Sequence, residues 1–199
     1  MMENRFNDRY VTGDLPWDLR KADTNLSRMV EKLRIKPCKV IDVGCGTGDN
    51  VFWLQQHGFE ATGIDYSEEA IRIANERKHG IKGTNQFDVA DILAAPYRKH
   101  HYDLAFDRGC FHTFDSEEER AKVAENIHAM LTPGGHWLSL IGNYDDGRLE
   151  IGPPKLKAAQ VVDAIEPWFE ILHLEQGYFD SKTPDPSKIW ICYSRKREM

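Results

Sequence analysis

Two periodicities of hydrophobic positions alternate along most of this chain. Between residues 25 and 33 the apolar side chains recur at helical spacing, and Pro37 ends that pattern before a β-branched run at residues 39–43. The same exchange of helical for extended pattern recurs downstream. It predicts helices over residues 25–33, 50–56, 68–80, 118–131 and 156–165, and strands over residues 39–43, 60–65, 85–89, 102–106, 135–141, 170–178 and 189–195.

Strands that alternate with helices imply a doubly wound α/β fold. Such connections pair the strands mostly in parallel and place helices on both faces of the sheet. The last two strand patterns have no helix between them and predict an antiparallel hairpin at the C-terminal end. The segment between the third and fourth strands contains Pro96, so the helix there is expected to be short or missing. The 199 residues fit one domain, residues 1–199, with its ligand beyond the carboxyl ends of the strands.

Composition narrows the classes of partner. With 41% hydrophobic and 29% charged residues, the chain has the composition of a folded protein. Its formal net charge of -6 argues against nucleic acid, because proteins that bind nucleic acid usually carry a basic face. No apolar run reaches the length that crosses a bilayer and no signal segment is apparent, which predicts a cytoplasmic protein without a membrane partner. The four cysteines show no metal-ligand spacing, so reduced thiols and no metal site are expected.

A glycine-rich turn follows the first predicted strand. In VIDVGCGTGDN, Gly44, Gly46 and Gly48 stand at alternate positions, where missing side chains let the backbone turn tightly and approach a ligand. This context favours a nucleoside-containing cofactor over a turn that merely joins strand to helix. Dinucleotide-binding turns carry a third glycine where this chain has Asp49. Asp49 and Asp42 would repel a diphosphate but attract the sulfonium and ammonium of S-adenosylmethionine. An NAD(P)-dependent oxidoreductase is the alternative.

Two later acidic positions fit the rest of such a nucleoside. Asp65 ends the second strand, where a carboxylate can accept both ribose hydroxyls, as it also does in NAD enzymes. Asp91 and Ile92 follow the third strand and offer a carboxylate for the adenine amino group beside an apolar edge for the ring. A capping or solvated Asp91 is the competing interpretation.

Together these segments resemble the class I S-adenosylmethionine-dependent methyltransferase family. VIDVGCGTG, GIDYS, DVADI, YDLAFDRG and LTPGGHWL occur in that family's order and spacing over residues 39–142. The resemblance implies a Rossmann-like sheet, S-adenosylmethionine as cofactor and S-adenosylhomocysteine as product. It also implies binding roles: Asp42 and the turn residues Gly44, Cys45, Gly46, Thr47 and Gly48 for the methionine part, Asp65 with Tyr66 for the ribose, Asp91 and Ile92 for the adenine, and Asp107 near the sulfonium.

The N-terminal segment YVTGDLPWDLR is similar to the lid of the thiopurine, thiol and halide methyltransferase branch. That branch places a tryptophan over the cofactor, and Trp17 is the matching residue, so residues 1–23 are expected to form a lid arm on a core of residues 24–199. Tyr10 stands where the branch often has tryptophan, and Arg20 replaces a glycine. The aromatic face of Trp17 can contact a sulfonium as a cation, or Trp17 can simply anchor the arm to the domain.

Candidate catalytic residues follow the fourth predicted strand, in FDRGCFHTF. His112 can deprotonate a thiol or phenol, and Arg108 can hold an anionic group of the substrate. The competing interpretation makes His112 a satisfied loop histidine, pairs Arg108 with a local aspartate and packs Cys110 as a small apolar residue. A further hypothesis combines Cys38, Cys45 and Cys110 as thiolate ligands for a soft metalloid, with little support from their spacing.

These observations predict a methyltransferase that acts on a small-molecule nucleophile, with sulfur or another soft atom preferred. Little sequence lies outside the core to dock a large substrate. The segment GNYDDGRLEIGPPKL, residues 142–156, is long enough to cover a small one. A non-catalytic domain that binds the cofactor and regulates a partner is the second alternative.

Overall fold

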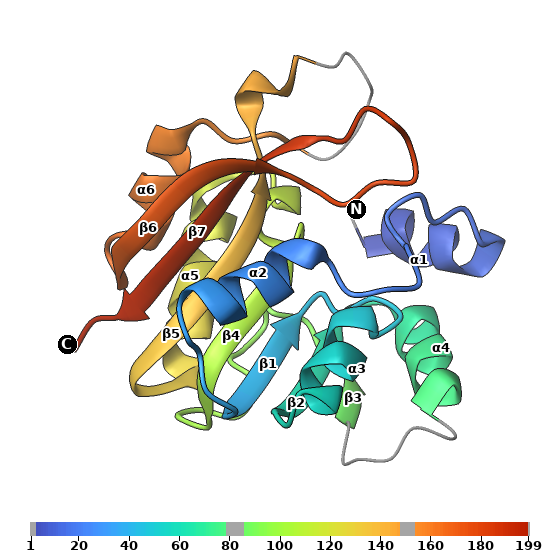
Figure 1. Ribbon diagram of the computed structural model, residues 1–199, viewed down its shortest axis with the longest axis horizontal. Coiled ribbons are helices and arrows are strands. Elements are labelled where there is room, and N and C mark those ends of the chain that lie inside the picture. Colours follow the sequence, from blue (N-terminus) through green and yellow to red (C-terminus); the bar gives the residue numbers. More distant parts are fainter. Residues whose placement is uncertain (1–2, 79–85, 148–153, 199) are drawn as a thin grey trace.

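A seven-stranded sheet forms the centre of the computed structural model, which describes residues 3–78, 86–147 and 154–198 (Figure 1). The strand order is β3-β2-β1-β4-β5-β7-β6. The first five strands pair in parallel, and β7 runs antiparallel to both β5 and β6. The strands are β1 (Lys39–Val43), β2 (Glu60–Asp65), β3 (Gln86–Val89), β4 (Tyr102–Arg108), β5 (Leu131–Gly142), β6 (Phe169–Tyr178) and β7 (Lys188–Lys196). The prediction of a Rossmann-like sheet with an antiparallel C-terminal hairpin is confirmed.

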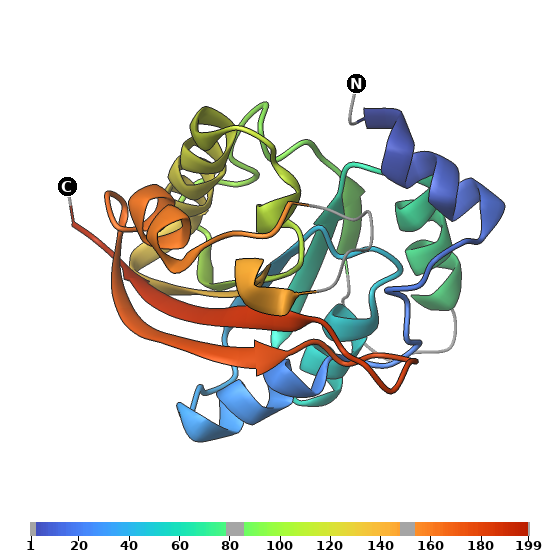
Figure 2. The same cartoon turned by 90° about the horizontal axis from the view of Figure 1, so that it is seen from above.

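Helices cover both faces of this sheet, as Figure 2 shows from above. One hydrophobic cluster joins α5 and α6 to the sheet, and a second joins α2, α3 and α4 to its other face. The additional helix α1 packs against α4 rather than on the sheet. The helices are α1 (Glu3–Thr12), α2 (Thr24–Lys32), α3 (Asp49–Gln56), α4 (Glu68–Lys78), α5 (Glu117–Met130) and α6 (Ala158–Ile165).

Local sequence signals set the ends of several elements. Ser116 caps α5 by accepting a hydrogen bond from the backbone N–H of Glu119, whose carboxylate in turn accepts one from the Ser116 backbone N–H. Asp23 caps α2 through the backbone N–H of Asn25. Both caps satisfy N–H groups that have no partner inside the helix.

Two features depart from the sequence prediction. α1 falls inside the stretch that was expected only to be an arm. The TPGG turn is included in β5, where the pairing with β4 shifts between Tyr102 and Leu104, so that residues 132–135 form an irregularity. No helix lies between β3 and β4 among the described residues, as expected. Gly80 lies outside the described residues.

The described helices are also all too short or too polar to cross a membrane. Of the loop that was expected to cover a substrate, residues 148–153 lie outside the described part of the chain. Its described start contains the short 3-10 helix Tyr144–Asp146, and Asn143 forms a bridge with Leu156.

Candidate cofactor and active site

The glycine turn between β1 and α3 has a backbone that other residues would not adopt without strain. Gly44, Gly46 and Gly48 have φ values of 71°, 54° and 89°. A Cβ atom at Gly44 would lie 2.7 Å from Cβ of Cys110, and one at Gly48 would lie 2.7 Å from the ring of Phe87. The turn is therefore packed on its flanks by neighbouring elements, and only glycine fits these positions.

Asp42, at the end of β1, is a buried carboxylate without a hydrogen-bond partner among the described residues. Both of its oxygens are inaccessible to solvent. Burial raises the pKa of Asp42 well above its usual value, and the charges of Asp107 and Asp65 raise it further. The positive charge of Arg108 and the nearby side chain of Asn50 offset only part of this effect. An unpaired buried carboxylate is costly, so the position suits a ligand that brings a positive charge.

Asp65, at the end of β2, is held in place by the backbone around it. One carboxylate oxygen accepts a hydrogen bond from the Gly46 N–H at 2.9 Å and the other accepts one from the Ser67 N–H at 2.9 Å. Burial raises the pKa of Asp65 above its ordinary value. A carboxylate has about four acceptor sites, so these bonds leave acceptor capacity for a hydroxyl group. The neighbouring Tyr66 side chain is exposed.

Asp91 and Ile92 lie in the turn after β3. Asp91 accepts a hydrogen bond from the Leu93 N–H at 2.8 Å, which is the local capping role that the sequence also allowed. Ile92 is buried and joins the hydrophobic cluster beneath α5. Their roles toward an adenine ring stay predictions.

Asp107, at the end of β4, organises the turn that follows it. Its carboxylate accepts hydrogen bonds from the backbone N–H groups of Cys110 and Phe111 and from the indole N–H of Trp137. Burial raises the pKa of Asp107 to about 6. These bonds give Asp107 a structural role, and its expected proximity to a sulfonium stays a prediction.

The N-terminal arm lies against the glycine turn through Tyr10. A Cβ atom at Gly46 would lie 2.7 Å from the Tyr10 hydroxyl. The indole N–H of Trp17 donates a hydrogen bond to that hydroxyl at 3.3 Å, and Phe6 packs edge-on against the indole. The guanidinium of Arg9 lies 4.6 Å from the centre of the Trp17 ring. Trp17 thus packs within an aromatic cluster with a cation over its ring, and its role toward a cofactor stays a prediction.

A chain of polar contacts connects the arm to α3 and α4. The hydroxyl of Thr47 donates to the buried carboxylate of Asp18, and the guanidinium of Arg77 donates to Thr47 and pairs with Asp49 at 2.5 Å. This ion pair offsets the charge of Asp49, so Asp49 contributes less repulsion toward a diphosphate than the sequence alone suggests. Asp42 differs from Asp49 in that its buried carboxylate has no ion-pair partner among the described residues. Arg20, which replaces a glycine of the lid motif, has a φ of 57°, a conformation that glycine adopts more readily.

Arg108 joins three segments that are distant in the sequence. Its Nε donates to the carboxylate of Asp23 at 2.6 Å, and its other nitrogens donate to the backbone carbonyls of Trp17 and Asp180. The ring of Phe179 lies 4.8 Å from the guanidinium carbon. The guanidinium therefore ties the arm, the start of α2 and the connection between β6 and β7 together, and its aspartate partner is the distant Asp23 rather than a local one. Its predicted contact with a substrate anion stays a prediction.

The remaining candidate side chains, His112 and three cysteines, do not all lie at the same end of the strands. His112 is buried beside Gly142 at the end of β5, and the Gly142 N–H donates to its Nδ1. Cys45 and Cys110 both lie near Gly44, but Cys38 precedes β1 and lies at the opposite end of that strand. Seven residues of extended chain span about 20 Å, so the three thiols cannot share one ion. Among the described residues no cluster of metal-ligating side chains occurs.

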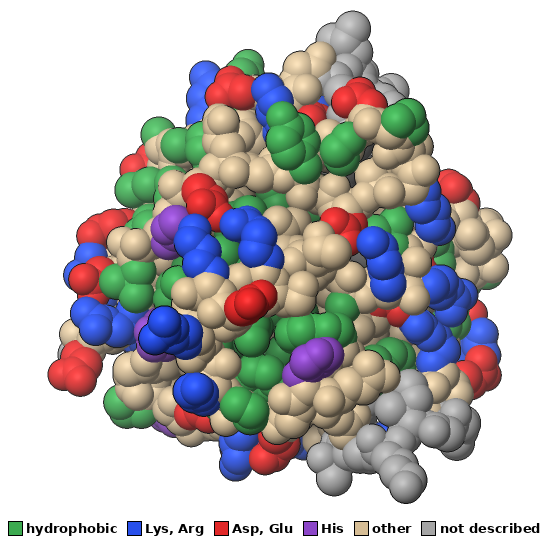
Figure 3. All heavy atoms as spheres, viewed as in Figure 1, with side chains coloured by type: hydrophobic (Ala, Val, Ile, Leu, Met, Phe, Trp, Pro, Cys, Tyr) green, Lys and Arg blue, Asp and Glu red, His purple; other side chains and the backbone are tan. Residues whose placement is uncertain are grey.

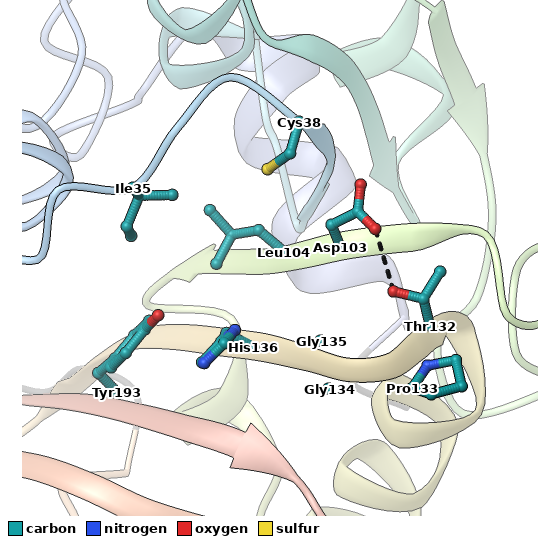
Figure 4. A pocket seen from close by; sticks show the side chains of 10 residues that line it. All are labelled: Ile35, Cys38, Asp103, Leu104, Thr132, Pro133, Gly134, Gly135, His136 and Tyr193. Carbon is teal, nitrogen blue, oxygen red and sulfur yellow. Dashed lines mark hydrogen bonds between the residues drawn. The ribbon is translucent and has the colours of Figure 1, made fainter.

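A cavity of about 190 Å³ lies at the end of the strands opposite the glycine turn, near the starts of β1 and β4 (Figure 4). Cys38 precedes β1 there, and Asp103 accepts a hydrogen bond from the Thr132 hydroxyl. This opening is remote from Asp42, Asp65 and His112, so it does not belong to the candidate site. It is lined by Ile35, Cys38, Asp103, Leu104, Thr132, Pro133, Gly134, Gly135, His136 and Tyr193.

Comparison with known proteins assigns a family to this arrangement. Residues 40–135 match the model of a methyltransferase domain family. Over 136 residues, 67% of this chain, the sequence is 35% identical to phosphoethanolamine N-methyltransferase 1 of Zea mays. The chain belongs to the class I S-adenosylmethionine-dependent methyltransferase family. The aligned part covers 25% of the maize protein, so the chain spans about a quarter of that relative's length.

Further relatives share the fold. A probable S-adenosyl-L-methionine-dependent methyltransferase, TehB of Haemophilus influenzae, is 31% identical over 51% of this chain and 35% of its own. A solved structure described as the conversion of a disulfide bond into a thioacetal group during echinomycin biosynthesis has a TM-score of 0.85 at 23% identity, covering 98% of this chain and 93% of that one. The 1,6-didemethyltoxoflavin-N1-methyltransferase of Burkholderia thailandensis, solved with S-adenosylhomocysteine, has a TM-score of 0.81 at 18% identity and covers 99% and 88%.

Proposed function

We propose that this chain binds S-adenosylmethionine at the carboxyl ends of β1, β2 and β4 and transfers its methyl group to a small-molecule nucleophile, with a thiol or another soft atom preferred. The buried, unpartnered carboxylate of Asp42 beside the glycine turn is the observation that carries this proposal. A cationic ammonium group would satisfy it, whereas the phosphates of a dinucleotide would not.

The other residues fit the parts of the same cofactor. The turn Gly44–Gly48 offers close backbone approach to the methionine part, and the remaining acceptor sites of Asp65 suit ribose hydroxyls. Asp91 and Ile92, in the turn after β3, are the residues assigned to the adenine in this proposal. When bound, the cofactor supplies an electrophilic methyl group, so the protein's task is mainly to align the nucleophile with it.

Several features support a small substrate. The arm, the start of α2 and the β6–β7 connection meet at Arg108 and cover part of the carboxyl end of the sheet. On the face shown in Figure 3, basic side chains lie among acidic ones, and both Arg28 and Lys32 pair with Glu175. Such an interleaved surface does not favour the phosphate backbone of nucleic acid.

The proposal is tested first by calorimetric titration with S-adenosylmethionine, S-adenosylhomocysteine and NADPH. We expect saturable binding of both sulfur nucleosides and none of NADPH. Asp42→Asn and Asp65→Ala each remove a charged acceptor, and should weaken binding by about 10- to 100-fold. Asp103→Asn, at the opposite end of the sheet, is the matched control and should bind like the unmodified protein.

Turnover then separates an enzyme from a cofactor-binding regulator. Formation of S-adenosylhomocysteine is followed with thiols, amines and halides as acceptors. Methylation of a thiol would support the preferred acceptor, and methylation of an amine alone would replace it. Tight cofactor binding without turnover of any acceptor would favour a non-catalytic role, and binding of NADPH alone would reject the methyltransferase proposal.

A further inference from the structure

The histidine at the edge of the candidate site has a fixed hydrogen-bonding arrangement. His112 belongs to the short 3-10 helix Phe111–Thr113, directly after β4, and its side chain is 6% exposed. Its Nδ1 lies 2.9 Å from the backbone nitrogen of Gly142. A backbone N–H can only donate, so Nδ1 must accept, and the proton of the neutral ring therefore resides on Nε2.

The surroundings of the ring hold this arrangement in place. A Cβ atom at Gly109 or at Gly142 would lie 3.2 Å from the imidazole. The backbone of the turn after β4 and the backbone at the end of β5 therefore pack closely against the ring. The ring of Phe179 lies 6.2 Å away, centre to centre. Burial, together with the positive charge of Arg108, lowers the pKa of His112 to about 4. The imidazole is therefore neutral at physiological pH.

The lone pair that a general base would use is thus already engaged. Accepting a proton at Nδ1 would break the bond to the Gly142 N–H and leave two donors facing each other in a buried position. Nε2 carries a proton and has no hydrogen-bond partner among the described residues. His112 therefore offers the site a donor and no free base.

We propose that His112 donates its Nε2–H to an acceptor oxygen of the methyl-accepting molecule and keeps that proton throughout the reaction. This inference rests on the proposed function and narrows its substrate class. The acceptor molecule carries a carbonyl or carboxylate oxygen near its nucleophilic atom. His112 does not remove a proton from that atom.

The arrangement of the ring can be tested in the free protein, independently of catalysis. Long-range ¹H–¹⁵N NMR spectra distinguish the two neutral forms of histidine from the charged form, and the signal missing from His112→Gln assigns His112. We expect the form protonated at Nε2 at every pH between 5.5 and 8. A ring protonated at Nδ1, or one that titrates near pH 6.5, would overturn the inference.

The role toward the substrate is tested with a matched pair of thiols. The probes are 2-mercaptobenzoate, which has a carboxylate beside its sulfur, and thiophenol, which lacks one. His112→Phe should lower kcat/KM for 2-mercaptobenzoate by about 10- to 100-fold, mainly through KM, and change that for thiophenol by less than about threefold. His112→Gln, whose amide can donate from a similar position, should recover most of the loss. Urea unfolding checks that both variants are folded.

The outcomes separate this inference from the proposed function. Equal losses of kcat/KM on both thiols would reject the donor role. The donor role would also be rejected if His112→Gln were as impaired as His112→Phe and the pH profile lost a titration near pH 6.5, because His112 would then act as the base. Failure of the methyltransferase proposal would appear instead as absent cofactor binding, with the NMR signal of His112 unaffected.

Discussion

At the scale of single residues, we expect Asp42 to lower the stability of the free protein and to strengthen binding of the cofactor. A carboxylate buried without a partner destabilises the free protein when it ionises, and it is retained here beside the turn that we assign to the cofactor. The same residue should therefore weaken the fold and strengthen the complex. This opposition distinguishes a binding residue from one that only packs.

The pH dependence of stability follows from the raised pKa of Asp42. Above its ordinary value of 3.8 the unfolded chain loses this proton while the native state retains it, so the native state binds more protons. Stability should then fall as pH rises from about 4, by up to about 1.4 kcal/mol per pH unit until the native group ionises. Asp42→Asn lacks this contribution. Urea unfolding at pH 4.5, 6 and 8 without cofactor should show that the free energy of unfolding of Asp42→Asn rises relative to that of the unmodified protein as pH rises.

A constant difference between the two proteins across that range would mean that Asp42 is paired in solution. Asp103→Asn serves again as control, because Asp103 accepts hydrogen bonds from the Lys39 N–H and from Thr132. Asparagine keeps one acceptor oxygen and loses the other, so loss of one of these bonds should lower stability at every pH in this range. The contrast isolates the unpartnered carboxylate as the cause.

Residue types at the glycine turn could be predicted from the sequence, whereas several of their partners could not. The alternate glycines and the strand-end aspartates follow a local spacing rule, and the structure places them at one edge of the sheet. Tyr10, Asp18, Asp23 and Phe179 come to the same edge from distant parts of the chain. Only the lid-like motif around Trp17 signalled two of them, and nothing local signalled Phe179.

At the scale of elements, the predictable ones bury a regular apolar pattern. β1 and β2 occupy the predicted residues, because a central parallel strand is apolar on both faces. α1 was missed because its sequence ENRFNDRYVT has few apolar residues, and its contacts are with α4. Register details such as the irregularity at residues 132–135 depend on how β5 meets β4, which no local pattern records.

The contact between elements that carries most consequence is the ion pair between Asp23 and Arg108. The carboxylate is fully buried and the guanidinium is 15% exposed. Asp23→Asn keeps a side chain that caps α2 well but places an amide against the guanidinium. Because it leaves a largely buried charge unpaired, we expect a loss of about 3 kcal/mol in the free energy of unfolding, measured by urea denaturation.

A surface pair gives the matched control for that prediction. Arg9 and Asp14 pair within the arm, and the Asp14 side chain is 72% exposed, so Asp14→Asn should change stability by less than about 1 kcal/mol. Adding Arg108→Met to Asp23→Asn removes the unpaired charge and should recover part of the loss. Equal effects of Asp23→Asn and Asp14→Asn would contradict the view that Arg108 depends on Asp23.

At the scale of the whole molecule, the sheet and the segments at its carboxyl edge differ in how they are held. The strands share two hydrophobic clusters with α2 to α6, whereas α1 rests on α4 and reaches the glycine turn chiefly through Tyr10. Because α1 contacts α4 and not the sheet, we expect α1 to open locally at a smaller cost in free energy than the core, while Asp18 and Asp23 hold the C-terminal part of the arm. An arm that opens would let cofactor and substrate enter, and an arm that closes would exclude water from the transfer.

Hydrogen exchange measured by mass spectrometry tests this division of the chain into a lid arm, residues 1–23, and a core. Without ligand, peptides from α1 should exchange faster than peptides from α3. Saturating S-adenosylhomocysteine should slow exchange in α1 and in residues 13–23 by roughly tenfold or more, because the bound nucleoside adds contacts to the closed arm. α6, on the opposite face, is the internal control, and its local exchange should change little. If α1 exchanges equally with and without the nucleoside, or if α6 slows as much as α1, the arm is not a lid and its contact with Gly46 is a fixed part of the fold.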